Sequence, residues 1–463
     1  MLPVRRQRGS ILVMTAVFIV VLIAVAALAI DVGRIVVLRS QLQNAVDAAA
    51  IAAAVELDGK DGARERAMAA AREATSHDQS FARIQDLLGA AGLPDAAFSF
   101  FCVIGAEYDV DPDEVTNLGI YCSGADDGSG RYPAGTDTES HYVRVDLDPA
   151  LLDDAAGRFT LDLFFLPVLQ LFTPATATEA AVRAMAVAGK HSIQCNYPPM
   201  ALCDPFEGAG GTFKNDMPVG TTIKLRDQGA GAAWAPGNFA FLATINGEKG
   251  ADKIAEALAF PEDDGCAPRS VTFAPGQKVN KTTAAINTRF DMYGPHFKAG
   301  QWQKWPPAPN IYKYVNTGGA LVAGLNDDRF LQPGWNYAAW EAAQVAMYGA
   351  LTNAPPEWAA NQPLMWDVYK WEIANNRVLK KPVTAHTPAG SAERRVFAVA
   401  VLSCQALGLK GRVTVPVNSP DGFAKVFIYK PAKGPSGAEI YGEYVGWFGE
   451  GDANYHVEVQ LYE

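Results

Sequence analysis

The residues that could perform chemistry do not stand at the spacings that catalytic or metal sites require. The six histidines show neither H-E-x-x-H nor any other metal-ligand spacing; they are His77, His141, His191, His296, His386 and His456. The chain also lacks G-x-S-x-G and S-x-x-K, the motifs that present a nucleophilic serine. The sequence therefore predicts a protein that is not an enzyme and that carries no cofactor and no metal.

Acidic residues offer two further options. Asp109, Asp111 and Asp113 place carboxylates at the spacing of an EF-hand calcium loop, but the sixth position is Glu114 and the twelfth is Ile120. An EF-hand needs glycine and glutamate at those positions, so a solvated acidic turn is the default interpretation. A glycosidase needs only two facing carboxylates, and the 50 acidic residues leave that option open without supporting it.

Six cysteines follow the apolar amino-terminal segment and could form disulfides. They are Cys102, Cys122, Cys195, Cys203, Cys266 and Cys404. An even count in an exported region is typical of a disulfide framework, and the absence of C-x-x-C disfavours zinc. The pairing cannot be derived from the count alone. Nearness in sequence favours Cys102–Cys122 and Cys195–Cys203, which leaves Cys266–Cys404.

Aromatic residues are concentrated in the carboxyl-terminal half. The tryptophans of this cluster are Trp302, Trp305, Trp335, Trp340, Trp358, Trp366 and Trp371. One interpretation is the core of a large domain. The other is an exposed aromatic surface for protein partners or glycans, because Trp and Tyr dominate binding hot spots. The sequence does not decide between them.

The elements that must position these residues begin with a membrane segment. Residues 1–10 form a short basic tail, and residues 11–30 contain no charge and only one polar side chain, Thr15. Twenty residues at about 1.5 Å each give about 30 Å, which matches the apolar core of a bilayer. This pattern predicts a transmembrane helix. The three arginines of the tail predict a cytoplasmic amino terminus and an exported remainder.

Two kinds of processing would change this anchor. Ala27-Leu-Ala29 resembles a signal-peptidase site with cleavage near Asp31, but the apolar run exceeds the usual length of a signal peptide core. Cleavage after Gly9 would resemble prepilin processing. Pilins usually carry glutamate at the fifth mature position, and this chain has Met14 there. The uncleaved anchor is the favoured interpretation.

The apolar helix is expected to continue beyond the membrane. Asp31 and Arg34 mark the outer interface, and residues 31–77 form a helical stalk that is interrupted at Gly59 and Gly62. Ala29 and Gly33 stand four residues apart, which creates a small-residue face suited to close helix packing.

The exported region is expected to contain two α+β domains. Residues 78–190 form a small one, and residues 191–463 form a larger one, rich in Trp, Pro and Gly, with an antiparallel sheet at its carboxyl end. The net charge is 39 − 50 = −11, which disfavours nucleic-acid binding because that needs a basic face.

The amino-terminal motifs resemble a known family. The order is Arg8-Gly9-Ser10, an apolar helix, Ala29-Ile-Asp31-Val-Gly33-Arg34, and Leu42-Gln-Asn44-Ala-Val-Asp followed by an alanine run. This arrangement resembles the TadE/TadG-like proteins of the Flp, or tight-adherence, pilus assembly system. Some TadG-like proteins also carry a von Willebrand factor A domain with a metal site, but its D-x-S-x-S signature is absent from this chain.

The resemblance implies a non-catalytic, single-pass component of pilus biogenesis in a bacterial inner membrane. Its amino terminus would lie in the cytoplasm, and its carboxyl-terminal region would be periplasmic or extracellular. Its partners would be membrane lipid and other pilus-assembly membrane proteins or pseudopilins, and its role would belong to surface adhesion. The alternative hypothesis is a membrane-tethered glycan-binding or carbohydrate-active protein, which the aromatic cluster motivates.

Overall fold

The computed structural model divides into two compact units, and each is described by itself. The described residues up to 190 and residues 459–462 form the first unit, and those from 191 to 458 form the second. In full, the structure describes residues 10–75, 93–104, 124, 131–148, 160–162, 179–195, 198–207, 213–226, 239–244, 246–248, 250–260, 266, 270–274, 279–314, 330–331, 336–388, 391–405, 408–416, 422–432, 439–449, 451–452 and 455–462.

Two helices open the first unit. Helix α1 (Ser10–Val55) covers the apolar run and the alanine-rich stretch without a break. The segment contains no Pro and a single Gly, Gly33, so little in it opposes a helix. Gly59 and Gly62 then adopt positive φ angles of 69° and 76°, which suit glycine, and the chain turns. Helix α2 (Ala63–Ala74) follows and packs against α1 through Ala67 and Ala71.

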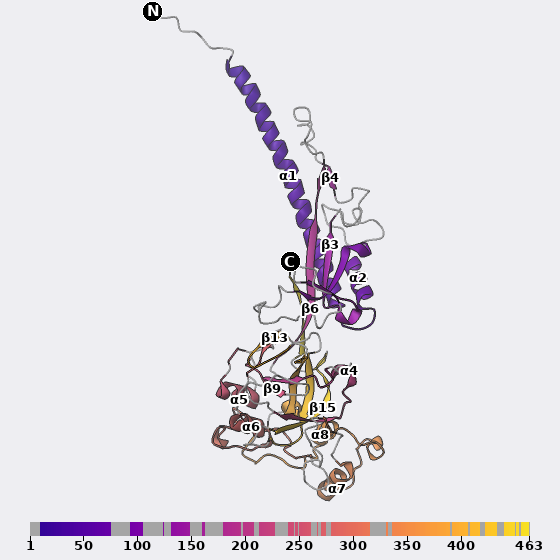
Figure 1. The fold of residues 1–463 in the computed structure, drawn as a ribbon, viewed down its shortest axis with the longest axis vertical. Coiled ribbons are helices and arrows are strands. Elements are labelled where there is room, and N and C mark those ends of the chain that lie inside the picture. Colours follow the sequence, from indigo (N-terminus) through magenta and orange to yellow (C-terminus); the bar gives the residue numbers. More distant parts are fainter. Residues whose placement is uncertain are drawn as a thin grey trace, which may run out of the picture. The chain divides into compact units, whose positions relative to one another are not determined.

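A five-stranded sheet belongs mainly to the first unit (Figure 1). Its order is β16-β6-β3-β1-β2, and the elements are β1 (Phe98–Ile104), β2 (Arg131–Pro133), β3 (Tyr142–Leu147), β6 (Ala184–Gln194) and β16 (Tyr455–Leu461). The short helices η1 (Asp95–Ala97) and η4 (Asp137–Glu139) precede β1 and β3, and β4 (Thr160–Asp162) pairs with β5 (Glu179–Ala181). The β1–β3 and β3–β6 pairs are antiparallel, with Val143 opposite Ala188 and Val145 opposite Ala186.

A seven-stranded sheet forms the centre of the second unit. Its order is β11-β8-β15-β14-β12-β7-β9, and the strands are β7 (Met200–Cys203), β8 (Thr222–Arg226), β9 (Phe239–Phe241), β11 (Phe330–Leu331), β12 (Val396–Leu402), β14 (Phe423–Ile428) and β15 (Glu439–Trp447). Strands β7 and β12 are parallel, and the other described pairs are antiparallel. A separate pair joins β10 (Ser270–Thr272) to β13 (Thr414–Pro416).

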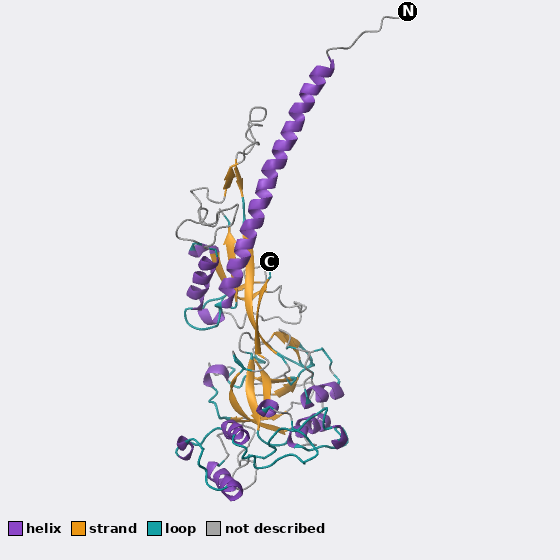
Figure 2. Ribbon diagram, turned by 180° about the vertical axis from the view of Figure 1, so that it is seen from behind, coloured by secondary structure: helices purple, strands orange, loops and turns teal. Residues whose placement is uncertain are grey.

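Helices cover this sheet on both faces (Figure 2). They are α4 (Phe213–Asp216), α5 (Ala251–Ala259), α6 (Val279–Asn287), η6 (Thr288–Phe290), η7 (Ala299–Gln301), α7 (Tyr337–Tyr348), η8 (Pro356–Ala359), α8 (Met365–Ala374) and η9 (Ala392–Arg395). Because side chains alternate along a strand, Val426 joins the core beneath α5 and α6, whereas Phe427 joins the core beneath α7 and α8.

The α+β class and the antiparallel-rich sheets are confirmed. One strand lies elsewhere than the sequence indicated. Residues 455–461 were expected in the sheet of the larger domain, but β16 pairs with β6 in the five-stranded sheet. Val459 and Leu461 pack against the core of the first unit, and the amide of Tyr462 donates to the carbonyl of Val187. The prediction of a strand at residues 455–461 is confirmed, but the pattern of a strand does not predict which strand pairs with it.

Candidate membrane anchor and helix interface

The amino half of α1 is an exposed apolar rod. From Leu12 to Ile30 its large apolar side chains are exposed, including Met14 at 70%. The helix is long and apolar enough to cross a membrane, and none of its most apolar window is buried in the protein. Apolar surface of this extent needs a non-aqueous environment. The segment therefore fits a membrane location, and Gly9 lies outside the described residues.

The carboxyl half of α1 is the core helix of the first unit (Figures 1 and 2). Its buried side chains are Leu38, Leu42, Ala45, Val46, Ala49, Ala50, Ala53 and Ala54, which share one core with Val143, Val145, Ala186 and Ala188. Alanines on both elements let the helix and the sheet approach closely. Residues 31–77, expected as a helical stalk interrupted at Gly59 and Gly62, are helical with a turn at those glycines, and one face of the helix is buried in the first unit. The same alanine stripe that predicted the helix buries it against the sheet.

Polar contacts fix the end of α1. The side chain of Gln43 donates to the carbonyl of Met185 at 2.7 Å and to the carboxylate of Asp47 at 2.8 Å. The ammonium group of Lys190 donates to the carbonyl of Val55 at 2.8 Å. That carbonyl belongs to the last helical residue and has no partner within the helix, so the lysine satisfies it and complements the helix dipole.

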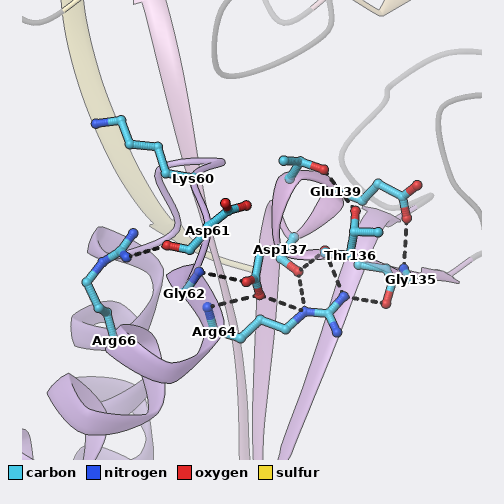
Figure 3. Close-up of polar contacts among 12 residues, drawn as sticks. Lys60, Asp61, Gly62, Arg64, Arg66, Gly135, Thr136, Asp137 and Glu139 are labelled. Carbon is cyan, nitrogen blue, oxygen red and sulfur yellow. Dashed lines mark hydrogen bonds and ion pairs between the residues drawn. The ribbon is translucent and has the colours of Figure 1, made fainter.

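The turn that follows α1 is held by the loop before β3 (Figure 3). The carboxylate of Asp137 accepts from the amides of Gly62 at 2.8 Å and Arg64 at 3.4 Å, which caps the start of α2 from a distant part of the chain. The guanidinium of Arg64 reaches back and donates to the hydroxyl of Ser140 at 2.7 Å and to the carbonyls of Ala134 and Thr136. The two segments therefore hold each other.

The opposite face of α1 stays exposed along its whole length. Ala29 and Gly33 lie on it, and a Cβ atom added at Gly33 would meet nothing within 4 Å. The same face carries Asn44, which is exposed, and the exposed apolar side chains of Val36, Val37, Ile51 and Val55. Sequence reasoning found Ala29, Gly33 and Asn44 but missed the four apolar residues, although their helical spacing opposite the alanine stripe was a usable signal.

Asp31, expected at the outer membrane interface, is buried within the protein. It is 0% exposed, whereas its neighbour Val32 is 46% exposed, and Arg34 is half-buried. Asp31 precedes Leu38 by seven residues and Leu42 by eleven, so it lies on the same face as the buried stripe. A charged residue next to an apolar run suggested the membrane boundary. The periodicity that follows it was the better guide to its burial.

The aromatic cluster is core. Trp305, Trp340 and Trp358 are 6%, 2% and 9% exposed, and Trp302, Trp366 and Trp371 are half-buried. The rings of Trp340, Trp358 and Trp371 contact one another edge to face, with centroids 5.7–6.0 Å apart. Trp335 lies outside the described residues. Trp305 belongs to the core beneath α5 and α6, and Trp340 and Trp358 belong to the core beneath α7 and α8, where Trp366 and Trp371 pack against them. The described tryptophans of this cluster therefore form no exposed aromatic platform.

A buried carboxylate sits within this core. Glu372 on α8 is 0% exposed, and its Oε1 accepts from the indole N–H of Trp340 at 2.6 Å and from the amide of Gln344 at 2.9 Å. Its Oε2 accepts from the hydroxyl of Tyr314 and the amide of Asn310. Burial raises the pKa of Glu372 to about 7, and the four donors oppose that rise. The group ties α7, α8 and the loop before them together.

The disulfides do not follow nearness in sequence. Cys195 is bonded to Cys266 and Cys203 to Cys404, so the expected pairs Cys195–Cys203 and Cys266–Cys404 are wrong. Strand pairing is the reason: β7 ends at Cys203, which lies opposite Leu402 on β12, and Cys404 follows two residues later. The expected pair Cys102–Cys122 includes a residue outside the described ones.

The other candidate sites give little. The acidic run Asp109–Asp113 lies outside the described residues. Within the part of the chain that the structure describes, no group of three His, Cys, Asp or Glu side chains could hold a metal ion.

Comparison with known proteins gives one result, and it falls on α1. Residues 9–56 match the family described as Flp pilus-assembly TadE/G-like, which confirms the resemblance for this segment. The chain matches no curated protein and no solved structure. The match supports a role related to pilus assembly and a membrane location.

Proposed function

We propose that this protein is a non-catalytic, membrane-anchored component of Flp, or tight-adherence, pilus biogenesis and acts in surface adhesion. The observation that carries the proposal is that the family match falls on one helix. The family match covers residues 9–56, and α1 covers Ser10–Val55. The part shared with pilus-assembly proteins is thus one helix, whereas the two folded units contribute everything else.

The geometry of α1 suggests how such a component would work. One face of its carboxyl half is buried in the first unit, so the helix and the unit move as one piece. The opposite face is exposed from Ala29 to Val55. Small residues at Ala29 and Gly33 let a partner backbone approach closely, which is the main source of helix association in lipid. A partner helix on this face would be coupled directly to the exported region.

We further propose the orientation and the partners. The basic tail would lie in the cytoplasm and both units on the exported side, which agrees with the positive-inside rule and with the disulfides. The partners would be other pilus-assembly membrane proteins or pseudopilins with an exposed apolar helix of their own. The glycan-binding alternative was motivated by a possible exposed aromatic surface. The described tryptophans are buried or half-buried, so that observation no longer supports it.

Gly33→Leu tests the proposed helix interface. The added side chain meets nothing inside the protein, so the units should stay folded. It would push a partner helix away, and we expect crosslinking of α1 to its membrane partners to fall several-fold. The readout is site-specific photocrosslinking from position 37 in membranes, with circular dichroism as the folding check.

Val20→Leu is the matched control. Val20 is 60% exposed and lies about 140° around the helix from Gly33, at about 100° per residue. It should leave crosslinking unchanged. Equal crosslinking in the wild type and Gly33→Leu would contradict the proposed interface.

A further inference from the structure

The two described disulfides cross each other along the chain. The four cysteines follow in the order Cys195, Cys203, Cys266, Cys404, and the first is bonded to the third and the second to the fourth. The bonded residues are 71 and 201 positions apart. All four lie in the second unit, so these bonds belong to the folding of one body.

Each pair is brought together by backbone pairing between segments far apart in the chain. Cys203 reaches Cys404 because β7 lies parallel to β12, and the amide of Asp204 donates to the carbonyl of Leu402 at 2.8 Å. Cys195 reaches Cys266 through an isolated antiparallel bridge. Strand β12 begins at Val396, so most of the chain must be present before Cys203 can find its partner.

Before that point, Cys195 and Cys203 are each other's nearest thiols. They are 203 − 195 = 8 positions apart, against 201 for the native bond of Cys203. The loop-closure scaling of an unfolded chain favours the short loop by about 100-fold. In an exported chain that is delivered from its amino end, both thiols also emerge long before Cys404. Oxidation in order of appearance therefore produces the wrong bond.

We infer that native pairing in this unit requires a thiol–disulfide isomerase as a folding partner, in addition to the dithiol oxidant that forms the bonds. The oxidant accepts two electrons and two protons for each disulfide, and it closes Cys195–Cys203 first. It has no means of reopening that bond. An isomerase presents a reactive thiolate beside a surface that accepts unfolded chain, which is the chemistry that reopening needs.

The rearrangement balances without net oxidation. The isomerase thiolate attacks the sulfur of Cys203, which forms a mixed disulfide and releases Cys195 as a thiolate. The Cys404 thiolate then attacks the same Cys203 sulfur, and the isomerase leaves as the thiolate that it was. The freed Cys195 and Cys266 thiols are joined by the oxidant in a second two-electron step. In the folded unit Cys203 and Cys404 are 1% and 0% exposed, so the correct bond is then protected.

The inference rests on the proposed exported location but not on the pilus role, and its test reads only the pairing. The full chain is produced in bacterial cells that keep the exported dithiol oxidase and either contain or lack the isomerase. Free thiols are alkylated and the protein is digested with trypsin. Peptide 191–214 holds both Cys195 and Cys203, while 254–269 holds Cys266 and 396–410 holds Cys404. Cleavage after Met200 then separates Cys195 from Cys203.

With isomerase, we expect one species in which all three peptides are linked. Without it, we expect at least half of peptide 191–214 to carry an internal bond. Equal amounts of the three-peptide species in both strains would overturn the inference. Gly33→Leu should show the same pairing as the wild type, so a failure of the proposed function leaves this result readable.

Two matched variants make the test specific. The double variant Cys195→Ser, Cys266→Ser removes the competitor, and its Cys203–Cys404 bond should form equally well in both strains. The double variant Cys102→Ser, Cys122→Ser keeps the crossed pairs and should still need the isomerase. A continued need in the first variant, or a lost need in the second, would contradict the inference.

Discussion

At the scale of single residues, the second unit contains two buried carboxylates whose pKa values are raised. Glu443 on β15 is 0% exposed, and its two oxygens accept from the amides of Met365 and Trp366, both at 2.9 Å. It thereby caps α8 from the sheet. Burial raises its pKa to about 8, although the two amides oppose that rise. Glu372, which lies on α8, has a pKa raised to about 7.

These carboxylates predict that the second unit is more stable in mild acid than in mild base. A carboxyl whose pKa is raised on folding binds more protons in the folded state, so the free energy of unfolding falls as pH rises. The window runs from the ordinary value of 4.5 to about 8, and the stabilisation is complete below it. Urea titrations at pH 5 and pH 8.5 should show the larger unfolding free energy at pH 5.

Two variants test whether the buried carboxylates cause this pH dependence of the unfolding free energy. Glu443→Gln removes the titrating group and should weaken the pH dependence, most clearly between pH 7 and 8.5. Glu357→Gln, at an exposed position, should leave the dependence as it is. A larger unfolding free energy at pH 8.5 than at pH 5 would contradict the assignment.

Helix α1 combines two roles at the scale of secondary structure. Its amino half is apolar enough to cross a membrane, and its carboxyl half is buried in the first unit. Such a helix must be fixed at its end if it is to transmit force or position. The contacts of Asp137 and Arg64 with the turn after α1 provide that attachment.

Asp137→Ala should destabilise the first unit. The change removes an acceptor from two amides at the start of α2 and an ion pair with Arg64 at 3.7 Å. Loss of a capping carboxylate costs about 1–2 kcal/mol of unfolding free energy. Asp61→Ala is the control, because it removes the same charge beside the same turn but no described side-chain contact. Denaturation of the full chain in detergent, followed by hydrogen exchange at α2, would measure both, and equal effects would refute the cap.

For the whole molecule, the continuity of α1 bears on processing. Residue 31 lies inside an unbroken helix that ends at Val55, and Asp31 is fully buried on its inner face. A protease needs an extended segment, so cleavage near Asp31 would require part of this core helix to unfold.

We expect the native protein to be full-length and membrane-bound, because the unbroken helix disfavours cleavage near Asp31 and Met14 replaces the glutamate that pilins usually carry. Intact mass and membrane fractionation measure this directly. A species beginning at Ser10 would instead indicate a processed, pilin-like subunit despite Met14. A soluble species beginning near Asp31 would contradict both the anchor and the proposed function.

Local patterns in the sequence determined the elements of this protein. An uncharged run predicts the apolar helix, an alanine stripe continues it, and alternating residues such as those of Tyr142–Leu147 predict strands, because each pattern reflects the periodicity of one element. The amino-terminal sequence motifs alone also identified the TadE/G-like segment.

Tertiary structure decided which elements and residues meet. It placed β16 beside β6, paired Cys203 with Cys404, buried Asp31, and chose Glu372 and Glu443 among 50 acidic residues for the core. It also buried one face of the carboxyl half of α1 in the first unit. Each outcome depends on contacts between residues far apart in the chain. The residue pattern of one segment predicts whether it forms a helix or a strand, but it does not predict which distant segment packs against it.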